Sequence, residues 1–249
     1  MPDRLQPKIA VVTGASAGFG AATARALSAV GFSVVVGARR FDRIERLAEE
    51  IVGKALVLDV TSTASVEAFA AEIPAVHLLV NNAGLSLGLD PIERANEEHW
   101  RTMFETNVMG VMRLTRALLP KLEASGEGHV IDIGSIAGFE TYAGGAGYTA
   151  SKHALRALTK TLRLELIGRP IRVTDISPGL AETEFSEVRF LGDKAKAKAP
   201  YQGMTPLAAE DVADCVVWAA TRPAHVNIDE IVVRPLDQAT ATLVHRGRL

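Results

Sequence analysis

The stretch Ile9-Ala10-Val11-Val12-Thr13-Gly14-Ala15-Ser16-Ala17-Gly18-Phe19-Gly20 decides the fold. Its first four residues are apolar and rich in branched side chains, which is typical of a central parallel strand covered on both faces. Glycines follow at 14, 18 and 20, and helix-forming residues begin at Ala21. This order predicts a strand, a glycine turn and a helix whose N-terminal amides can bind a pyrophosphate. We expect the dinucleotide contacts of this turn at Gly14, Ser16, Gly18, Phe19 and Gly20.

Strands and helices alternate along the rest of the chain. Further short apolar runs lie at 33–37, 55–58, 77–80, 130–133, 171–176 and 230–233, and helix-forming segments separate most of them. Such alternation predicts an α/β fold, in which helices cover both faces of one doubly wound parallel sheet, the Rossmann fold. We expect a single domain over residues 1–249. Ligands bind beyond the carboxyl ends of the strands in these sheets, so the functional residues should gather there.

The composition excludes several classes of protein. The 249 residues are 48% hydrophobic and 22% charged, which is ordinary for a folded domain. A net charge of -2 gives no general attraction to nucleic acid or to acidic membranes. Cys215 is the only cysteine, so no internal disulfide is possible, and the six histidines lack ligand spacing, so we expect no metal site. The polar N-terminus and the lack of a long apolar run predict a cytoplasmic protein.

The end of the second predicted strand indicates which dinucleotide is bound. An acidic residue there would bind the ribose 2′-hydroxyl of NAD, whereas an arginine would bind the 2′-phosphate of NADP. This chain has Ala38-Arg39-Arg40, which favours NADP because guanidinium groups match phosphate oxygens. Asp42 is the dissenting residue, and we expect it to start or cap the helix that follows.

Two later strand ends extend the expected dinucleotide site. Asp59 follows the third strand, and it either hydrogen-bonds the adenine amino group or caps the helix that begins near Thr61 or Thr63. The motif Asn81-Asn82-Ala83-Gly84 follows the fourth strand. Its small residues would let a cofactor lie against the backbone, and its amides could hold neighbouring strand ends together. We therefore expect Asp59, Asn81, Ala83 and Gly84 at the cofactor.

Tyr148 and Lys152 are the candidates for proton transfer. Four residues apart, they project from the same face of a predicted helix. A neighbouring cation favours the phenolate, so this spacing can bring the pKa of Tyr148 down from about 10. Ser135, at the end of the fifth strand, could hydrogen-bond the same substrate oxygen. Taken alone, the pattern fits equally well an exposed tyrosine and lysine beside a loop serine.

Asn107 lies within a long helical pattern that runs from 97 to 123. Asparagine is a poor interior helix residue because its amide competes for backbone groups, so it predicts a local kink. A tolerated surface asparagine is the alternative reading.

The pattern loosens after Gly179. We expect residues 180–205 to form a substrate lid that overhangs the pocket. Arg189, within this segment, could anchor a substrate carboxylate, although a solvated surface arginine fits the pattern as well. The tail at 235–249 has little packing signal, and it is either frayed or crosses to a neighbouring subunit.

With these motifs assembled, the chain resembles the short-chain dehydrogenase/reductase family over essentially its whole length. The matching motifs are Thr13-Gly14-xxx-Gly18-x-Gly20, Asn81-Asn82-Ala83-Gly84, Asn107, Ser135, Tyr148-xxx-Lys152 and Pro178-Gly179-xxx-Thr183. The resemblance implies a catalytic tetrad with Tyr148 as the acid/base. Ser135 would orient the substrate oxygen, Lys152 would bind the nicotinamide ribose and lower the tyrosine pKa, and Asn107 would hold a water. Further cofactor contacts are implied at Tyr148, Val60, Pro178, Gly179 and Thr183. Phe19 departs from the usual isoleucine or leucine but keeps its bulk.

The segments 17–20, 142–145, 184–190 and 223–227 are similar to those of NADP-dependent 3-hydroxy acid dehydrogenases. This similarity implies reversible hydride transfer between NADP and a small hydroxy acid in a homotetramer, with Ser135, Tyr142, Tyr148 and Arg189 at the substrate. A carbonyl reductase for bulkier ketones or aldehydes would use the same tetrad. A noncatalytic NADP sensor would share the fold without needing the tyrosine and lysine. A structural or interaction protein would leave the glycine turn and the arginines unexplained.

Overall fold

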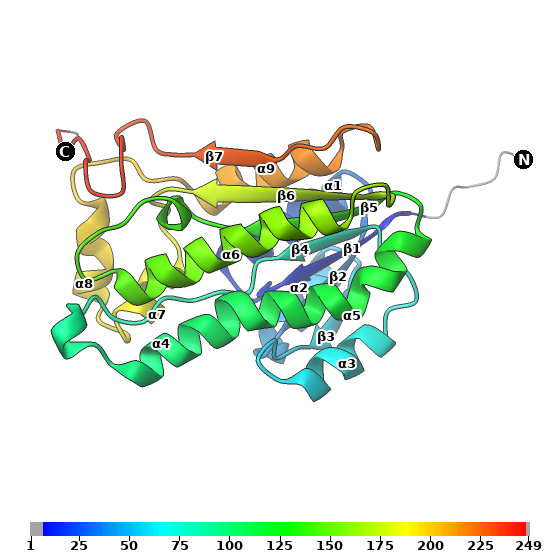
Figure 1. The fold of residues 1–249 in the computed structure, drawn as a ribbon, viewed down its shortest axis with the longest axis horizontal. Helices are drawn as coiled ribbons and strands as arrows, with labels where there is room; N and C mark the ends of the chain where they lie inside the picture. The colour runs from blue at the N-terminus through cyan, green and yellow to red at the C-terminus, as the bar shows by residue number, and fades with distance from the viewer. Residues whose placement is uncertain (1–6, 248–249) are drawn as a thin grey trace, which may run out of the picture.

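Within residues 7–247, which the computed structural model describes, seven parallel strands form one sheet (Figure 1). The strands are β1 (Ile9–Thr13), β2 (Ser33–Ala38), β3 (Lys54–Val57), β4 (Leu78–Asn81), β5 (Gly128–Ile133), β6 (Ile171–Pro178) and β7 (Glu230–Val233). Their order across the sheet is β3-β2-β1-β4-β5-β6-β7. The chain therefore winds outward from β1 in one direction and from β4 in the other, which confirms the predicted doubly wound α/β sheet.

Helices cover both faces of this sheet. They are α1 (Gly18–Ala29), α2 (Phe41–Glu50), α3 (Thr63–Ala71), α4 (Glu97–Phe104), α5 (Gly110–Ala124), α6 (Ala146–Glu165), α7 (Glu184–Arg189), α8 (Lys194–Lys198) and α9 (Ala209–Ala220). One apolar core packs α1, α2 and α9 against the sheet, and a second packs α3, α5 and the end of α6 against the opposite face. Figure 1 shows α5 and α6 in front of the sheet, and α1 and α9 behind it.

Strand β1 shows why the sheet is covered on both sides. Ala10 and Val12 belong to the first core, whereas Val11 belongs to the second, and all three are fully buried. Successive side chains of a strand point to opposite faces, so an uninterrupted apolar run is compatible only with two covered faces. The apolar run of β1, which predicted a central strand, is thus explained by the burial of both faces of the sheet.

The helical pattern over 97–123 is interrupted in the structure. Helices α4 and α5 are joined by a π-helical turn at Glu105–Met109, and Asn107 lies in the middle of that turn. Single π-helical turns within helices are frequent at functional sites. The kink expected at Asn107 is therefore present, and Asn107 is buried rather than a surface residue.

One helix start differs from the expectation, and a second places the candidate acid/base. Helix α2 begins at Phe41 with Arg40 at its N-cap, so Asp42 does not cap the helix but lies in its first turn, where it pairs with Arg46 on the next turn. Helix α6 begins at Ala146, with Gly145 at its N-cap, so Tyr148 lies within its first turn. Helix ends are set by tertiary contacts as well as by local sequence, which is why such differences arise.

The segment that follows β6 folds into short helices over the carboxyl ends of the strands. It contains α7, α8 and a 3-10 turn at Ala199–Tyr201. In Figure 1 these helices lie at one end of the sheet, beside the N-terminal end of α6.

The described part of the tail packs on its own chain. Gln238 is buried, and its Oε1 accepts a hydrogen bond from the Leu180 amide at 2.8 Å. Arg246 donates to the carbonyls of Pro200 and Gln202 at 3.1 and 2.6 Å. The tail therefore contacts the segment 180–205 at both of its ends.

Candidate active site

A cavity of about 360 Å³ opens at the carboxyl ends of the strands. The loops after β1 to β5 line it, together with the start of α6 and helix α7. Its lining residues are Gly14, Ser16, Ala17, Gly18, Phe19, Gly37, Ala38, Arg39, Arg40, Leu58, Asp59, Val60, Thr61, Asn82, Ala83, Gly84, Leu85, Thr106, Ile133, Gly134, Tyr148, Lys152, Thr183, Glu184, Phe185 and Val188. The position agrees with the rule that ligands of open α/β sheets bind beyond the strand ends.

The glycine turn forms one wall of the cavity. Gly14 and Gly18 have φ values of +63° and +53°, a region that favours glycine. Gly20 does not line the cavity, but a Cβ there would lie 2.6 Å from the Gly14 carbonyl oxygen, so any side chain would displace the turn. No side chain caps the N-terminus of α1, where Ala17 is the N-cap, so its first amides are free of such a partner. This geometry fits a pyrophosphate.

The arginines lie at the end of β2, as the sequence predicts. Arg39 and Arg40 both line the cavity, and Arg40 donates from Nη2 and Nε to Ser16 Oγ at 2.8 and 3.1 Å. Asp42 is engaged with Arg46, so it does not oppose a phosphate at this position. The residues present therefore fit the 2′-phosphate of NADP.

Asp59 lines the cavity after the third strand. Its Oδ1 accepts hydrogen bonds from the amide and hydroxyl of Thr61, at 3.0 and 2.7 Å, while Ser62 is the N-cap of α3. Burial raises the pKa of Asp59, but the hydrogen bonds from Thr61 and the charge of Arg39 outweigh it, so the pKa is lowered. Asp59 therefore shapes the turn before α3 and does not cap the helix itself. Adenine recognition stays a prediction.

Asn81 and Asn82 hold neighbouring strand ends together, as the sequence predicts for their amide groups. Asn81 is buried and donates to Thr115 Oγ1 and Asp132 Oδ1, at 3.0 and 2.8 Å, so its side chain points away from the cavity. Asn82 lines the cavity and donates to the carbonyls of Thr13 and Gly14, at 2.8 and 3.3 Å. The residue of this pair that borders the cavity is thus Asn82, which the sequence did not single out for the cofactor.

Tyr148 and Lys152 lie together in the first two turns of α6. They are only 8% and 6% exposed, so they are not the exposed surface pair that the sequence alone allowed. Lys152 Nζ lies 5.9 Å from the centre of the Tyr148 ring and donates to the Ile133 carbonyl at 2.8 Å. Both residues line the cavity, and Ser135 lies at the strand end opposite Tyr148.

The pKa of Tyr148 is raised, which corrects the expectation that Lys152 would lower it. Burial is the main cause of the increase. Arg189 and a hydrogen bond with Ser135 act in the opposite direction. Lys152 is itself buried, and burial lowers its pKa to about 8. In this cavity the cation that favours the phenolate is therefore Arg189, from the segment after β6.

Two buried carboxyl groups lie behind Lys152. Asp132 and Asp175 are register partners on β5 and β6, and the charges of both raise the pKa of Lys152 against the effect of burial. Burial raises the pKa of Asp175 to about 6. Ser177 donates to its Oδ1 at 2.8 Å, and no described hydrogen bond reaches Oδ2, which is buried. These groups had no signal in the sequence, since aspartate inside a strand is usually a surface residue.

Asn107 connects three elements behind Tyr148. Its Oδ1 accepts from the Leu85 amide at 2.9 Å, and its Nδ2 donates to the Leu85 carbonyl at 2.9 Å and to Ser151 Oγ at 3.0 Å. The side chain thus fixes the loop after β4 against α6. Its expected role in holding a water stays a prediction.

Arg189 and Tyr142 both lie beside Tyr148, and their expected role as substrate contacts stays a prediction. The guanidinium of Arg189 donates from Nε to Ser86 Oγ at 3.0 Å and from Nη2 to Tyr142 Oη at 3.3 Å. Its central carbon lies 5.1 Å from the Tyr148 ring centre and 5.0 Å from that of Phe185. None of the ion pairs found among residues 7–247 involves Arg189. A positive charge without an acidic partner therefore lies beside the candidate acid/base.

Some predicted cofactor contacts lie outside the cavity. Pro178 pairs with Val233 at the end of β6, and a Cβ on Gly179 would lie 2.2 Å from Gln238 Oε1, so these residues pack against the tail. Thr183 does line the cavity, at the N-cap of α7. Helix α7 also contributes Glu184, Phe185 and Val188, which sequence reasoning did not assign to the cofactor.

Between residues 7 and 247, no helix combines the length and apolar character needed to cross a membrane. The same residues contain no group of three or more His, Cys, Asp or Glu side chains that could hold a metal ion.

The chain matches the short chain dehydrogenase family over residues 8–193. It is 58% identical over 235 residues to an uncharacterized oxidoreductase of Mycobacterium tuberculosis, with 94% of each chain covered. It is 46% identical over 247 residues to the NADP-dependent 3-hydroxy acid dehydrogenase YdfG of Salmonella typhimurium, covering 96% of this chain and all of that one. The chain therefore belongs to the short-chain dehydrogenase family, as its motifs predicted.

A solved structure supports the same relationship. The closed form of serine dehydrogenase in complex with NADP+ superposes with a TM-score of 0.91 at 44% identity, covering 96% of this chain and 99% of that one. The serine dehydrogenase of Escherichia coli gives a TM-score of 0.80 at 38% identity, with 93% and 99% covered. The fold, the family and the oxidoreductase class are thus shown for this chain.

Proposed function

We propose that this protein is an NADP-dependent oxidoreductase that interconverts a small 3-hydroxy acid and its carbonyl form. The single observation that carries the substrate class is the position of Arg189 beside Tyr148, without an acidic partner among the described residues. A guanidinium in a desolvated pocket binds a carboxylate through paired, charge-assisted hydrogen bonds. The similarity to YdfG and to serine dehydrogenase, whose names give a 3-hydroxy acid and serine as substrates, supports the same class.

Arg39 and Arg40 are the residues that would hold the 2′-phosphate, and the glycine turn would hold the pyrophosphate. NADP, when bound, accepts a hydride during oxidation of the alcohol and donates one during reduction of the carbonyl. NADP is also the cofactor named for YdfG and for the serine dehydrogenase complex.

In oxidation, Tyr148 as phenolate takes the proton of the substrate hydroxyl while the carbon loses its hydride. In reduction, the Tyr148 hydroxyl returns that proton to the carbonyl oxygen. Ser135 hydrogen-bonds the same oxygen and orients it, and Lys152 binds the nicotinamide ribose. Asn107 holds the loop after β4 against α6 and would hold a water of the proton relay. Proximity and alignment of the reacting atoms are the main contribution of the protein.

The segment 180–205 acts as the lid in this proposal. Support comes from α7, because Phe185 makes an edge-on ring contact with Tyr148 at 5.5 Å between ring centres, and Arg189 lies over the same ring. An arginine held on a movable helix would complete the carboxylate site only when the helix is in place.

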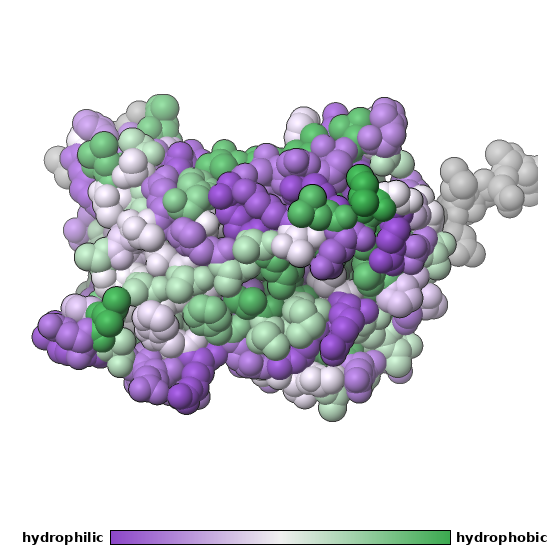
Figure 2. Space-filling view, viewed as in Figure 1, coloured by the Kyte–Doolittle hydropathy of each residue, from purple (hydrophilic) through white to green (hydrophobic). Residues whose placement is uncertain are grey.

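A homotetramer and a cytoplasmic location complete the proposal. Figure 2 shows hydrophobic side chains gathered over α5 and α6, the face that lies in front in Figure 1. The exposed apolar side chains of these elements include Met109, directly before α5, at 39% and Leu164 of α6 at 75%. Apolar surface of this kind is compatible with contact between copies of the chain.

The test is turnover of a substrate panel by purified protein with NADP and, separately, NAD, followed by nicotinamide absorbance. The panel contains serine, 3-hydroxyisobutyrate, 3-hydroxypropionate and simple secondary alcohols. We expect turnover of hydroxy acids with NADP, its loss in Tyr148→Phe with NADP binding retained, and a raised KM in Arg189→Met. Turnover of uncharged alcohols alone would favour the carbonyl reductase, and unchanged activity of Tyr148→Phe would contradict the mechanism.

A further inference from the structure

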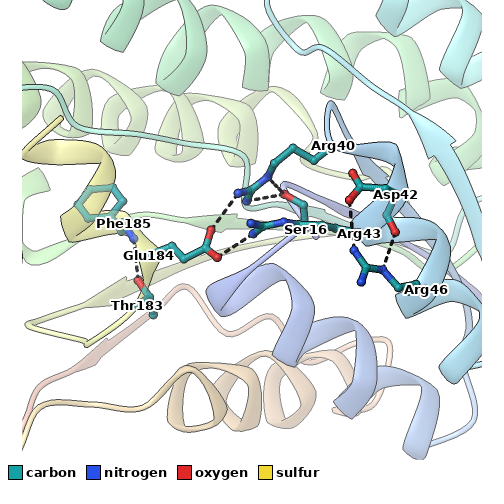
Figure 3. A network of polar contacts seen from close by, with 8 residues as sticks. All are labelled: Ser16, Arg40, Asp42, Arg43, Arg46, Thr183, Glu184 and Phe185. Atoms are coloured by element: carbon teal, nitrogen blue, oxygen red, sulfur yellow. Dashed lines mark hydrogen bonds and ion pairs between the residues drawn. The ribbon is translucent and has the colours of Figure 1, made fainter. Parts of the chain in front are cut away.

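Glu184 is the first residue of α7 and forms ion pairs with two arginines of a distant segment. Its Oε1 lies 2.7 Å from Arg43 Nη1, and its Oε2 lies 2.9 Å from Arg40 Nη1. Figure 3 shows the carboxylate of Glu184 facing both guanidinium groups, with Ser16 on the other side of Arg40. The lid helix is thereby fastened to the end of β2 and the start of α2.

The carboxylate occupies the part of the cavity where a 2′-phosphate would bind. Ser16, Arg39, Arg40 and Glu184 all line the cavity, and Arg40 follows directly after the strand end that reaches the adenosine ribose. Carboxylate and phosphate present the same kind of oxygen pair to a guanidinium. Glu184 is therefore chemically equivalent to the ligand group expected at Arg40.

Glu184 is the acidic residue that pairs with Arg40 and Arg43, because the nearby Asp42 is engaged elsewhere. The carboxylate of Asp42 is turned toward Arg46 in Figure 3 and pairs with it at 3.2 Å. Burial raises the pKa of Glu184, but the hydrogen bonds from Arg43 and Arg40 outweigh it, so the pKa is lowered and the group is an anion at neutral pH.

The two ion pairs of Glu184 are exposed enough for another anion to replace the carboxylate. The side chains of Arg40, Arg43 and Glu184 are 46%, 40% and 43% exposed. Pairs with this exposure are weak, because water and salt screen them. A phosphate dianion, with more charge and more acceptor oxygens than a carboxylate, would replace Glu184 at both guanidinium groups.

Helix α7 connects this position to the catalytic tyrosine. Arg189, five residues after Glu184, ends the helix beside Tyr148, and Phe185 contacts the Tyr148 ring. The last turn has contacts of its own, since Arg189 donates to Ser86 Oγ and Tyr142 Oη. Release of Glu184 would therefore free the N-terminal end of the helix that carries the proposed carboxylate anchor.

We infer that the 2′-phosphate of NADP competes with Glu184 for Arg40 and Arg43, and that this exchange releases the start of α7 from the end of β2. NAD, which lacks this phosphate, leaves Glu184 in place. Glu184 is thus a specificity-determining residue that couples the choice of cofactor to the lid. The inference rests on the proposed NADP dependence.

Binding of nucleotide fragments tests the exchange without turnover. Calorimetry with 2′,5′-ADP, which carries the 2′-phosphate but no nicotinamide, is compared with 5′-AMP. We expect Glu184→Gln to bind 2′,5′-ADP roughly three- to tenfold more tightly than the unmodified protein, because no carboxylate must be displaced from two exposed pairs. Affinity for 5′-AMP should not change. Glu187→Gln is the matched control, since Glu187 lies exposed on the same helix and takes part in none of the ion pairs described.

Hydrogen exchange of the peptide 183–191 tests the release of α7. We expect 2′,5′-ADP, but not 5′-AMP, to raise exchange in the unmodified protein and in Glu187→Gln. In Glu184→Gln, exchange should be high already and insensitive to 2′,5′-ADP. Unchanged or weaker binding of 2′,5′-ADP by Glu184→Gln, or a nucleotide-induced rise that persists in this variant, would overturn the inference while leaving the NADP dependence intact. Equal affinity of the unmodified protein for both nucleotides would contradict the NADP dependence itself.

Discussion

The guanidinium carbon of Arg189 lies 5.1 Å from the centre of the Tyr148 ring. The two residues are far apart in sequence, and the contact forms because α7 folds back over the start of α6. Burial raises the pKa of Tyr148, and the charge of Arg189 opposes that effect. One side chain thus has two expected roles, since it would bind the substrate carboxylate and also favour the phenolate of the acid/base.

We therefore expect Arg189→Met to raise the pKa of Tyr148. The chain contains three tyrosines, so the phenolate absorbance of Tyr148 can be isolated by subtracting the titration of Tyr148→Phe from that of the unmodified protein. The same subtraction in the Arg189→Met background should give a midpoint at higher pH. An unchanged midpoint would show that the guanidinium does not act on the phenol.

Replacement of Arg39 and Arg40 by alanine should weaken NADP binding selectively. Each charged hydrogen bond to the phosphate contributes about 1.5–3 kcal/mol, so we expect either single substitution to increase the Kd of NADP by roughly 10- to 150-fold. The Kd of NAD should change little, because NAD has no 2′-phosphate. Calorimetry with both nucleotides is the measurement, and Arg101→Ala is the control because Arg101 pairs with Glu97 on the surface of α4 and does not line the cavity. Equal losses for both nucleotides would argue against recognition of the phosphate.

Asn107→Ala should destabilise the fold. The substitution removes the partners of the Leu85 amide and carbonyl and of Ser151 Oγ. Unpaired buried polar groups cost about 1–3 kcal/mol each, so we expect the free energy of unfolding to fall by roughly 2–4 kcal/mol. Denaturant unfolding measures the effect. Asn96→Ala, which removes the N-cap of α4, is the comparison, with an expected cost of about 1 kcal/mol. A smaller loss for Asn107 than for Asn96 would contradict the prediction.

Asp175→Asn should make the protein more stable at neutral pH. The pKa of Asp175 is about 6 in the fold against an ordinary value of 3.8, so the native state binds this proton more tightly than the unfolded chain. Ionisation as the pH rises between these values therefore costs native stability, and asparagine avoids that cost. We expect no difference below about pH 4 and a gain of roughly 1–3 kcal/mol at pH 7, measured by denaturant unfolding. A difference that does not change with pH would contradict the assigned pKa.

The sheet, the glycine turn and the strand-end residues could be predicted because their signals are local. An uninterrupted apolar run such as that of β1 requires two covered faces, and the glycines at 14 and 18 adopt the φ values for which glycine is suited. The placement of Arg39 and Arg40 at the cavity follows from the same strand-end rule.

The remaining features depend on contacts between distant segments. The partnership of Glu184 with Arg40 joins the lid to the second strand, and no local pattern indicates it. The raised pKa of Tyr148 follows from burial, which spacing between Tyr148 and Lys152 cannot give. The inward direction of Asn81 is set by Thr115 and Asp132 on other elements.

The contacts of the tail have a practical meaning for handling the protein. Arg246 donates to the carbonyls of Pro200 and Gln202, and Gln238 accepts from the amide of Leu180, so the tail holds the segment 180–205 at both of its ends. Strand β1 starts at the amino ends of the strands, at the end of the sheet opposite to the cavity (Figure 1). An affinity tag fused after the tail would strain these hydrogen bonds and alter the affinity for substrate. The same tag at the amino end would leave the kinetics unchanged.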